Sequence, residues 1–444
     1  MKKPFTRRDF LRDAAVTGIG VWIGTESWAQ SRPKSPNDQI HFACIGVDGK
    51  GDSDSDDAAR FGTIVAICDV DEEKLNKKAQ QYPKARKYTD WRKMLDEMGR
   101  QVDACTVSTP DHSHAPATAM ALHLGKHVYT QKPLAHSIYE CRRLGELARR
   151  MRAATQMGNQ GTADNSMRQN AYRVRAGALG AVREVHVWTN RPIWPQGGER
   201  SATKPVPATL HWDLWLGPAP VRPYGDNYHP FSWRGWWDFG TGALGDMACH
   251  TVNLPYMALE LNNPISVLAT TSADNHDSYP QASKIVYEFA ANHLHPPLTM
   301  TWYDGGNLPP KELIPAALLP KSGQMPDSGS LIIGDKGVLY TPGDYGGGGQ
   351  IVGGVDVGDV PYPVSPGHWE EFVRAMRGGA PATSNFPDYA SDLAATVLLG
   401  NVGVWVAGQK VEWDHQHLRV TNSRDIADQV AHIIRPPYRP GYSL

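Results

Sequence analysis

Lys132, Asp246 and His250 have side chains of the types that carry out chemistry on a hydroxyl group. Asp246 and His250 stand four residues apart in a segment with helical character, so both lie on one face of that helix. A histidine accepts a proton near neutral pH, a lysine stabilises an oxyanion, and an aspartate orients the base or binds substrate. The alternative is a buried helix in which the aspartate is a cap and the histidine is a core residue.

Lys132 follows a strand, turn, helix and strand that place it at a ligand-binding edge. Residues 104–107 are predicted to form a buried strand, 115–124 a helix and 127–129 a second strand. In such a βαβ unit the turn at 108–113 and the Lys132 loop both lie at the carboxyl ends of parallel strands, where open α/β sheets bind ligands. The alternative is an ordinary surface lysine in a loop.

A glycine-rich turn near the start of the folded body predicts a dinucleotide site. Residues 41–45 are typical of a strand, the turn carries Gly46, Gly49 and Gly51, and the next strand ends at Asp69. Glycines let the backbone approach a pyrophosphate, a helix N-terminus stabilises its charge, and an acid about 20 residues further on binds the ribose hydroxyls. Because a carboxylate repels the 2′-phosphate of NADP, NAD is favoured over NADP as the cofactor.

The turn departs from the usual fingerprint at its third position, which is Asp48 in place of glycine. A carboxylate beside a pyrophosphate costs electrostatic energy unless the side chain turns away. A glycine turn alone is also compatible with a purely structural connection. The strand before it and the acid after it favour the cofactor site.

The stretch from Val107 to Pro133 carries a more specific signal. It contains Thr109-Pro110-Asp111-His112-Ser113-His114, then Gly125-Lys126-His127-Val128, then Gln131-Lys132-Pro133. With the D-x-x-x-H pair, this constellation resembles the Gfo/Idh/MocA oxidoreductases, the family of glucose-fructose oxidoreductase and inositol dehydrogenase. The family usually has Glu-Lys-Pro, so the chain lacks at position 131 a carboxylate that would be a charge partner for the lysine.

The resemblance implies an α/β fold class with two domains. The first is an N-terminal Rossmann dinucleotide-binding domain over residues 38–160. The second is a C-terminal α+β substrate and oligomerisation domain over residues 161–444, built on a large open, mainly antiparallel sheet. It also implies that Lys132, Asp246 and His250 are the catalytic set, and that the protein is a homo-oligomer. The Pro/Gly-rich stretches at 192–207 and 341–361 are expected to be surface loops.

Ten residues are expected to bind the cofactor, from the glycine turn, the acid and the family motif. They are Gly46, Gly49, Gly51, Asp69, Thr109, Pro110, His112, His114, Gln131 and Lys132. For the two histidines, capping of the following helix is an equal alternative. No metal is expected, because neither histidine has ligand spacing with a partner.

Aromatic side chains gather ahead of Asp246 and suggest a carbohydrate substrate. They include Trp188, Trp194, Trp212, Trp215, Tyr224, Tyr228, Trp233, Trp236 and Trp237. Flat rings flanked by polar residues suit the apolar faces and hydroxyls of a sugar. The residues expected near the substrate are Tyr228, His229 and Arg234.

The first 29 residues predict export. Arg7 and Arg8 precede Phe10-Leu11, an apolar run follows over 14–24, and the small residues Ser27 and Ala29 fit a cleavage site. The arrangement resembles a twin-arginine signal peptide over 1–29. A basic amphipathic helix is the alternative. We expect a periplasmic or otherwise exported protein. The run is too short and glycine-rich for a membrane span of about 20 residues, and a net charge of −1 gives no reason to expect nucleic-acid binding.

The expected function is oxidation of a ring hydroxyl of a sugar or glycoside by hydride transfer to a tightly held nicotinamide. Two alternatives stay open. An NAD-dependent glycoside hydrolase would use the same oxidation transiently, followed by elimination, water addition and re-reduction. A non-catalytic sugar-binding protein would have kept only the fold, with Asp48 and Gln131 in its favour and the intact Lys132, Asp246 and His250 against it.

Overall fold

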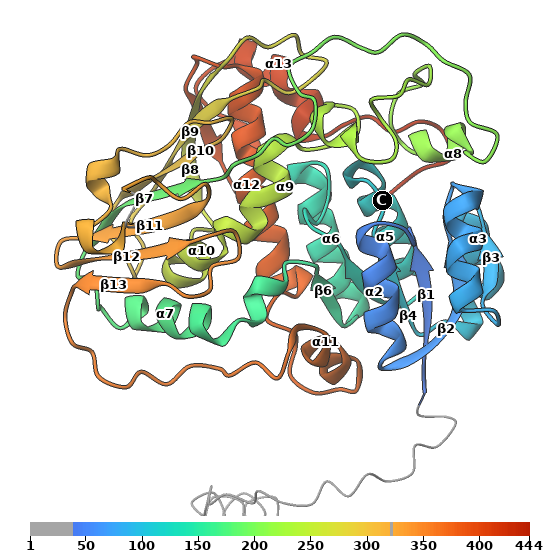
Figure 1. Cartoon of the computed structure of the whole chain (residues 1–444), viewed down its shortest axis with the longest axis horizontal. Coiled ribbons are helices and arrows are strands. Elements are labelled where there is room, and N and C mark those ends of the chain that lie inside the picture. The colour runs from blue at the N-terminus through green and yellow to red at the C-terminus, as the bar shows by residue number, and fades with distance from the viewer. Residues whose placement is uncertain (1–38, 320–322) are drawn as a thin grey trace, which may run out of the picture. The chain divides into compact units, whose positions relative to one another are not determined.

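A six-stranded and a nine-stranded sheet organise the part of the chain that the structure describes (Figure 1). The structure is a computed structural model, and it describes residues 39–319 and 323–444. The signal peptide predicted over 1–29 lies outside the described residues. Residues 40–444 form one compact unit.

The six-stranded sheet is parallel throughout, in the order β3-β2-β1-β4-β5-β6. Its strands are β1 (Ile40–Ile45), β2 (Gly62–Cys68), β3 (Arg86–Tyr88), β4 (Ala104–Val107), β5 (His127–Thr130) and β6 (Thr155–Met157). Continuous apolar runs fit strands that are covered on both faces, and β4 is buried at every position. Since β1 lies between β2 and β4, the strand order reverses there, and a crevice opens outside the carboxyl ends of these strands.

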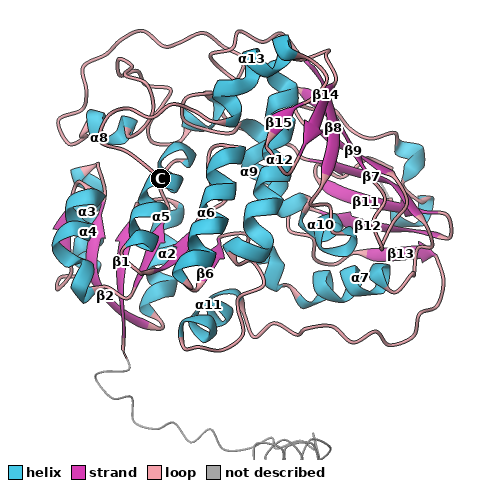
Figure 2. Ribbon diagram, turned by 180° about the vertical axis from the view of Figure 1, so that it is seen from behind, coloured by secondary structure: helices cyan, strands magenta, loops and turns pink. Residues whose placement is uncertain are grey.

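Helices cover both faces of this sheet, and three of the five named next begin at side-chain caps (Figure 2). They are α2 (Lys50–Ala59), α3 (Glu72–Gln81), α4 (Trp91–Met98), α5 (His114–His123) and α6 (Ile138–Met151). The side chains of Asp71 and Asp90 accept hydrogen bonds from the first turns of α3 and α4. Ser137 and Glu140 form a capping box at the start of α6. The Rossmann domain expected from the sequence is confirmed.

The second sheet has the order β13-β12-β11-β7-β10-β9-β8-β14-β15. Only the β7–β10 pair is parallel among the described strand pairs of this sheet, so the mainly antiparallel sheet is confirmed. Its strands are β7 (Val182–Trp188), β8 (Pro264–Thr271), β9 (Ser283–Phe289), β10 (Leu298–Tyr303), β11 (Gly329–Gly334), β12 (Gly337–Pro342), β13 (Gln350–Gly353), β14 (Val411–Asp414) and β15 (Arg419–Val420). The stretch 341–361, expected as a loop, contains β13, because its backbone pairs with β12.

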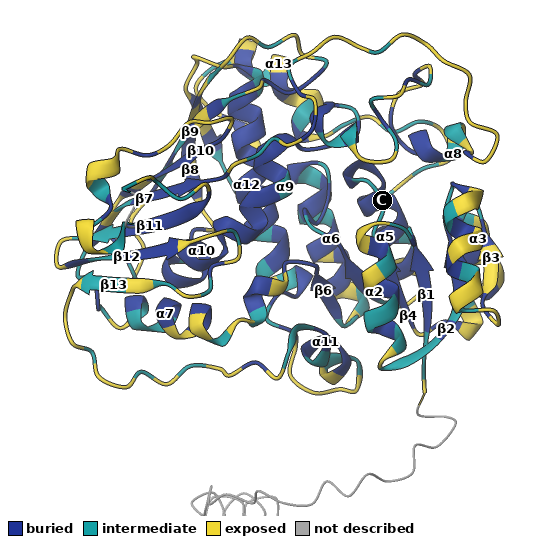
Figure 3. Cartoon of the chain, viewed as in Figure 1, coloured by how far each residue is buried: buried dark blue, intermediate teal, exposed yellow. Residues whose placement is uncertain are grey.

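A layer of helices separates the two sheets, and α12 (Ser391–Trp405) is its centre (Figure 1). This helix is apolar around its circumference and packs against β8 and β9, against α6, and against α9 (Gly242–Thr251). Figure 3 shows that α12 is buried along most of its length. The remaining helices of this half are α7 (Asn165–Arg175), α8 (Trp212–Leu216), α10 (Asn253–Leu259) and α13 (Arg424–Ile434). One continuous apolar core therefore fixes α9 relative to the Rossmann sheet.

The C-terminal half returns to complete the core of the nucleotide domain. Helix α11 (His368–Met376) places Trp369 flat against Tyr129 of β5, with ring centroids 4.3 Å apart. At the end of the chain, Tyr442 packs against Trp91 of α4 at 6.2 Å. Within residues 39–319 and 323–444, no helix is both long and apolar enough to cross a bilayer.

Candidate active site

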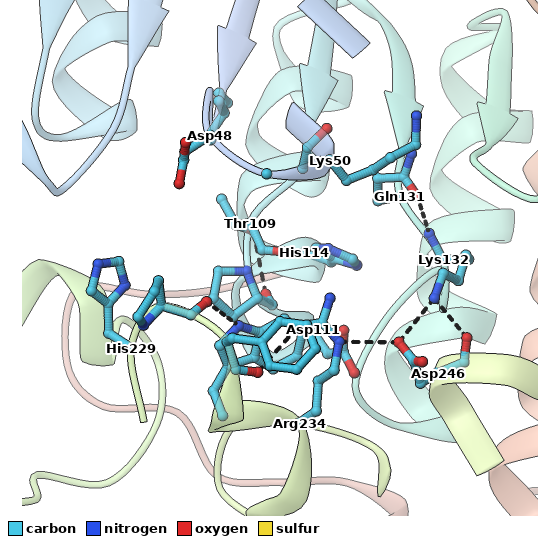
Figure 4. A pocket seen from close by; sticks show the side chains of 18 of the residues that line it. Asp48, Lys50, Thr109, Asp111, His114, Gln131, Lys132, His229, Arg234 and Asp246 are labelled. Atoms are coloured by element: carbon cyan, nitrogen blue, oxygen red, sulfur yellow. Dashed lines mark hydrogen bonds and ion pairs between the residues drawn. The ribbon is translucent and has the colours of Figure 1, made fainter. Parts of the chain in front are cut away.

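A cavity of about 460 Å³ lies at the carboxyl edge of the Rossmann sheet (Figure 4). Its lining comes from the ends of β1, β2, β4 and β5, from α9, and from the long connection between β7 and α9. The sheet supplies one wall and the helix layer fixes the other. Residues far apart in the sequence therefore meet around one space, as expected for a topological switch point.

The glycine turn shapes one end of this cavity. Gly46 has a φ of 76°, and a Cβ there would lie 2.6 Å from the carbonyl oxygen of Ser108. Gly49 also lines the cavity and has a φ of 56°. Gly51 lies behind the lining, where a Cβ would lie 2.1 Å from the carbonyl oxygen of Gly46. The turn leaves a backbone cradle that a side chain would fill, and this fits the pyrophosphate of a dinucleotide.

Asp48 is turned towards a positive charge. Its carboxylate lies 3.7 Å from Nζ of Lys74 on α3, and both residues line the cavity. The pair offsets the charge that the sequence places in the pyrophosphate turn. Lys50, at the first position of α2, adds another cation to this end of the cavity. The departure from the glycine fingerprint is thus compatible with a nucleotide.

Asp69 ends β2 at the same edge of the sheet. Its carboxylate accepts hydrogen bonds from the backbone N–H groups of Val47 and Asp71, both at 3.0 Å. Burial raises the pKa of Asp69, and the two amides act against that rise. A carboxylate fixed beside the glycine turn fits a ribose diol and disfavours a 2′-phosphate.

Gln131 has a buried carboxylate as its partner. Its Nε2 donates to Oδ2 of Asp54 on α2 at 2.8 Å, and the Ser108 hydroxyl donates to the same oxygen at 2.7 Å. Nζ of Lys50 donates to the other oxygen at 2.8 Å. A carboxylate therefore lies beside position 131, although this chain has a glutamine there in place of the family's usual glutamate.

Lys132, Arg234 and Asp246 converge at the other end of the cavity (Figure 4). Nζ of Lys132 donates to the backbone carbonyl oxygen of Asp246 at 2.6 Å and to its Oδ1 at 3.0 Å. Nε of Arg234 donates to the same Oδ1 at 3.1 Å. Burial opposes ionisation of Asp246, but the two cations outweigh it and lower its pKa to about 2. Asp246 is therefore an anion that holds two cations in place.

His250 lines the same cavity one helical turn beyond Asp246. Its ring meets that of Tyr345 edge to face at 4.8 Å, and its Nδ1 is buried without a hydrogen-bond partner among the described residues. Burial, and then the charge of Lys132, lower the pKa of His250 well below its usual range. The imidazole is neutral at neutral pH and is free to accept a proton.

The two histidines of the family motif have different surroundings. His114 lines the cavity, and its ring nitrogens lie 2.8 Å from the carbonyl oxygens of Pro133 and Thr109. His112 lies behind the cavity wall, where its nitrogens face the carbonyl oxygens of Phe239 and Trp215. Burial lowers the pKa of His112 to about 3. His112 is held by the protein and, contrary to our expectation, does not line the nucleotide cavity.

The three residues expected near the substrate lie in different places relative to the cavity. Arg234 lines the cavity next to Asp246. His229 lines it at the nucleotide end, with Nε2 at 3.2 Å from the carboxylate of Asp71. Tyr228 is buried among aromatic rings, including Trp236 at 5.1 Å, and is outside the cavity lining. The expectation for Tyr228 therefore has no support in the cavity's geometry.

Sequence reasoning missed several lining residues. They are Lys50, Lys74, Asp111, Gln160, Ile193, Phe231 and Tyr345. Lys50 lies within the predicted nucleotide turn, and its position there could have identified it. Tyr345 lies in a glycine-rich stretch with no motif, so the sequence holds no signal for it. The described residues hold no group of three or more His, Cys, Asp or Glu side chains arranged for a metal ion.

The fold and the cavity define a dinucleotide-binding protein of the Rossmann class. Residues 40–159 match the NAD-binding Rossmann fold of one oxidoreductase family, and residues 176–293 match the C-terminal alpha/beta domain of the same family. The two matches together cover more than half of the 444 residues. The chain belongs to the Gfo/Idh/MocA oxidoreductase family, and its N-terminal domain binds NAD.

Curated relatives match the chain over a limited stretch. A glycosyl hydrolase family 109 protein of Solibacter usitatus is 30% identical over 154 residues, which are 31% of this chain and 34% of the relative. An inositol 2-dehydrogenase of Salmonella typhimurium is 24% identical over 125 residues, 28% of this chain and 37% of the relative. The chain thus spans about a third of the length of these relatives.

Solved structures share the whole fold at low identity. The WlbA dehydrogenase of Bordetella pertussis, in complex with NADH and UDP-GlcNAcA, is 16% identical with a TM-score of 0.59, over 85% of this chain and 99% of that one. The aldose-aldose oxidoreductase of Caulobacter crescentus, complexed with glycerol, is 17% identical with a TM-score of 0.55, over 84% and 99%. The similarity shows that both domains have the arrangement of this family.

Proposed function

We propose that the protein oxidises a ring hydroxyl of a sugar or glycoside and keeps its NAD bound. The observation that carries this proposal is that Lys132, Asp246 and His250 line one cavity with the nucleotide turn. Relatives named inositol dehydrogenase and neighbours crystallised with sugar ligands support a carbohydrate substrate. NAD, when bound against Gly46, Gly49 and Asp69, supplies the acceptor for the hydride.

The protein side chains manage the proton and the charge. Neutral His250 takes the proton from the substrate hydroxyl, because burial keeps the imidazole uncharged. Lys132 stabilises the oxygen as negative charge develops on it. Asp246 stays ionised and fixes the lysine through the contact at 3.0 Å. The base, the cation and the residue that positions the cation are thus assigned within one cavity.

A strap formed by residues 201–231 supports retention of the cofactor. Its backbone meets the chain after β2, since N–H of Glu72 donates to the carbonyl of Thr209 at 2.8 Å. Two side-chain contacts join the same segments: Nε2 of His211 lies 2.7 Å from the carboxylate of Glu72, and Nε2 of His229 lies 3.2 Å from that of Asp71. The strap is therefore fastened next to Asp69, at the ribose end of the cavity. A nucleotide held beneath it leaves only when these contacts open.

Export through the twin-arginine route is part of the same proposal. That route carries folded proteins, so a cofactor bound in the cytoplasm reaches the periplasm with its enzyme. Retention removes the need for a nucleotide supply outside the cytoplasm. We also propose a homo-oligomer formed through the open face of the second sheet, where Ile265 and Leu268 of β8 are 42% and 37% exposed.

Net glycoside hydrolysis is the second candidate function. The relative named as a glycosyl hydrolase family 109 protein, at 30% identity, favours it. The same Lys132 and His250 would serve both outcomes, since hydrolysis begins with the same oxidation. A non-catalytic sugar-binding protein is disfavoured, because Asp48 is offset by Lys74 and the catalytic set is assembled.

The deciding experiment starts with a denaturing extract of the purified mature protein. We expect stoichiometric NAD, identified by absorbance and mass. The native protein is then mixed with sugars and glycosides without added nucleotide. A ketone product supports oxidation, and a released aglycone with no net NADH supports hydrolysis. An empty protein that also fails to bind added NAD would contradict the proposal.

A further inference from the structure

Arg234 is held rigidly on several sides. Its Nε donates to Asp246 at 3.1 Å, and its Nη1 donates to the carbonyl oxygen of Phe231 at 3.1 Å. The guanidinium carbon lies 4.3 Å from the ring centroid of Trp233 and 4.7 Å from that of Phe231. These contacts fix the rotamer of a long side chain before any ligand arrives.

The remaining side of Arg234 faces the cavity. Its Nη2 has no hydrogen-bond partner among the described residues, and the side chain is 23% exposed. A guanidinium has five N–H donors, and the protein uses few of them here. A fixed cation with free donors binds an oxyanion with little loss of side-chain entropy. The proton chemistry assigned to His250 and Lys132 makes no use of these donors.

The charges that line the cavity outside the glycine turn and the end of β2 do not balance. Apart from the charged residues of those two segments and of α3, the lining holds the cations Lys132, Arg191 and Arg234 and the anions Asp246 and Asp111. Asp111 is buried, and its carboxylate accepts a hydrogen bond of 2.6 Å from Thr241. Three positive charges against two negative charges leave at least one positive charge, even with Asp111 ionised. A neutral sugar would leave that charge uncompensated in a partly closed site.

We propose that the substrate is an acidic sugar, and that its oxyanion pairs with Nη2 of Arg234 while Arg191 contributes at the cavity mouth. The inference rests on the proposed function and names the substrate class of the same cavity. A carboxylate, a phosphate ester and a sulfate ester share this chemistry, and the test below separates them.

The test uses the holoenzyme without added nucleotide and follows the near-ultraviolet absorbance of NADH formed on the protein. Matched substrates are glucuronate against glucose and galacturonate against galactose, with a hexose phosphate and a hexose sulfate as further arms. Because each bound NAD is reduced once, the assay measures the second-order rate constant of a single turnover. We expect one acidic class to exceed its neutral partner in this rate constant by at least about tenfold, which corresponds to about 1.4 kcal/mol. The class that does so identifies the oxyanion.

Variants assign the effect to Arg234. Arg234→Gln should lower the acid-over-neutral preference to about twofold or less, and Arg191→Gln should lower it in part. Arg183→Gln removes an exposed arginine of β7 outside the cavity and should keep the full preference. Nucleotide content and thermal unfolding of each variant show whether it has folded, and Arg234→Lys keeps the charge if Arg234→Gln does not fold.

Three results would overturn the inference. Equal rate constants for acidic and neutral partners would do so while leaving the oxidoreductase intact. A preference that persists in folded Arg234→Gln would place the oxyanion elsewhere. Retained NAD that no sugar of either kind reduces or turns over would remove both the inference and the proposed function.

Discussion

The amide of Gln131 donates to the carboxylate of Asp54 at 2.8 Å, and neither side chain is appreciably exposed to solvent. The carboxylate that the family motif usually has at position 131 is thus found across the hydrogen bond, on helix α2. A buried carboxylate is stabilised by a hydrogen bond from an amide and destabilised by a second carboxylate. Changing Gln131 or Asp54 alone should therefore destabilise the protein.

The first prediction exchanges these two groups. Gln131→Glu places two carboxylates within hydrogen-bond distance in the interior and should lower the free energy of unfolding by about 3 kcal/mol at neutral pH. The double variant with Asp54→Asn restores one amide and one carboxylate and should recover most of that loss. Chemical denaturation of the single and double variants measures both, and a stable Gln131→Glu protein would refute the coupling.

The catalytic assignment predicts large losses of rate without loss of fold. Lys132→Ala and His250→Ala should each lower kcat/KM by about 10² to 10⁴ while NAD content stays near that of the unchanged protein. Lys93→Ala, at a side chain that is 70% exposed, is the matched lysine control. Unchanged turnover in both site variants would show that the assignment is wrong.

The lowered pKa of His250 predicts an unusual pH profile. An ordinary histidine base becomes protonated below about pH 6.5, and its reaction slows there. Because burial holds His250 neutral to lower pH, kcat/KM should stay flat from about pH 8 to about pH 5. Kinetics across that range with an uncharged substrate provide the measurement. A decline centred near pH 6.5 would mean that the base is another group or that the pKa is normal.

Asp246 should make stability depend on pH in the acid range. Its pKa is about 2 in the folded protein and about 3.9 in the unfolded chain. The resulting stabilisation of about 2.6 kcal/mol is fully present above about pH 5 and is lost progressively as the pH falls from about 5 to about 1. The stability difference from Asp246→Asn should therefore shrink over this interval. A constant difference at all pH values would show that the carboxylate is not held ionised.

The strap predicts how fast NAD leaves. The exposed His211–Glu72 pair is worth about 0.2–1 kcal/mol, and the His229–Asp71 pair is largely shielded from solvent. The double variant His211→Ala with His229→Ala should therefore speed NAD release by up to about tenfold. Release is measured by dilution into a nucleotide trap. The control is His293→Ala, whose partner Glu260 lies 3.8 Å away on the other domain. Identical release in all variants would show that the strap does not retain the nucleotide.

The Rossmann half could be predicted from sequence because its signals are local. The strand, turn, helix and strand around Lys132 follow one another within 30 residues, and each has its own period and stop signal. The Lys132–Asp246 contact joins residues 114 positions apart. Only the family resemblance indicated that pairing, because nothing in the spacing encodes it.

Where the structure differs from the sequence-based expectations, tertiary packing is the reason. Strand β13 lies in a glycine-rich stretch and exists through its pairing with β12. Tyr228 has the chemistry of a sugar-binding residue, but neighbouring rings cover it. His112 has the chemistry of a ligand, but two carbonyl groups of distant segments surround it. Residue type alone does not tell a covered side chain from an accessible one.

The contacts of Trp369 and Tyr442 with the first domain determine when that domain can complete its folding during synthesis. The ribosome delivers β5 more than 200 residues before the helix that covers Tyr129, and it delivers Trp91 more than 300 residues before Tyr442. Until then the nucleotide-binding sheet has an open apolar face and an unfinished edge. The nascent chain therefore reaches its final core, and a site able to keep a nucleotide, only after residue 442 has left the ribosome.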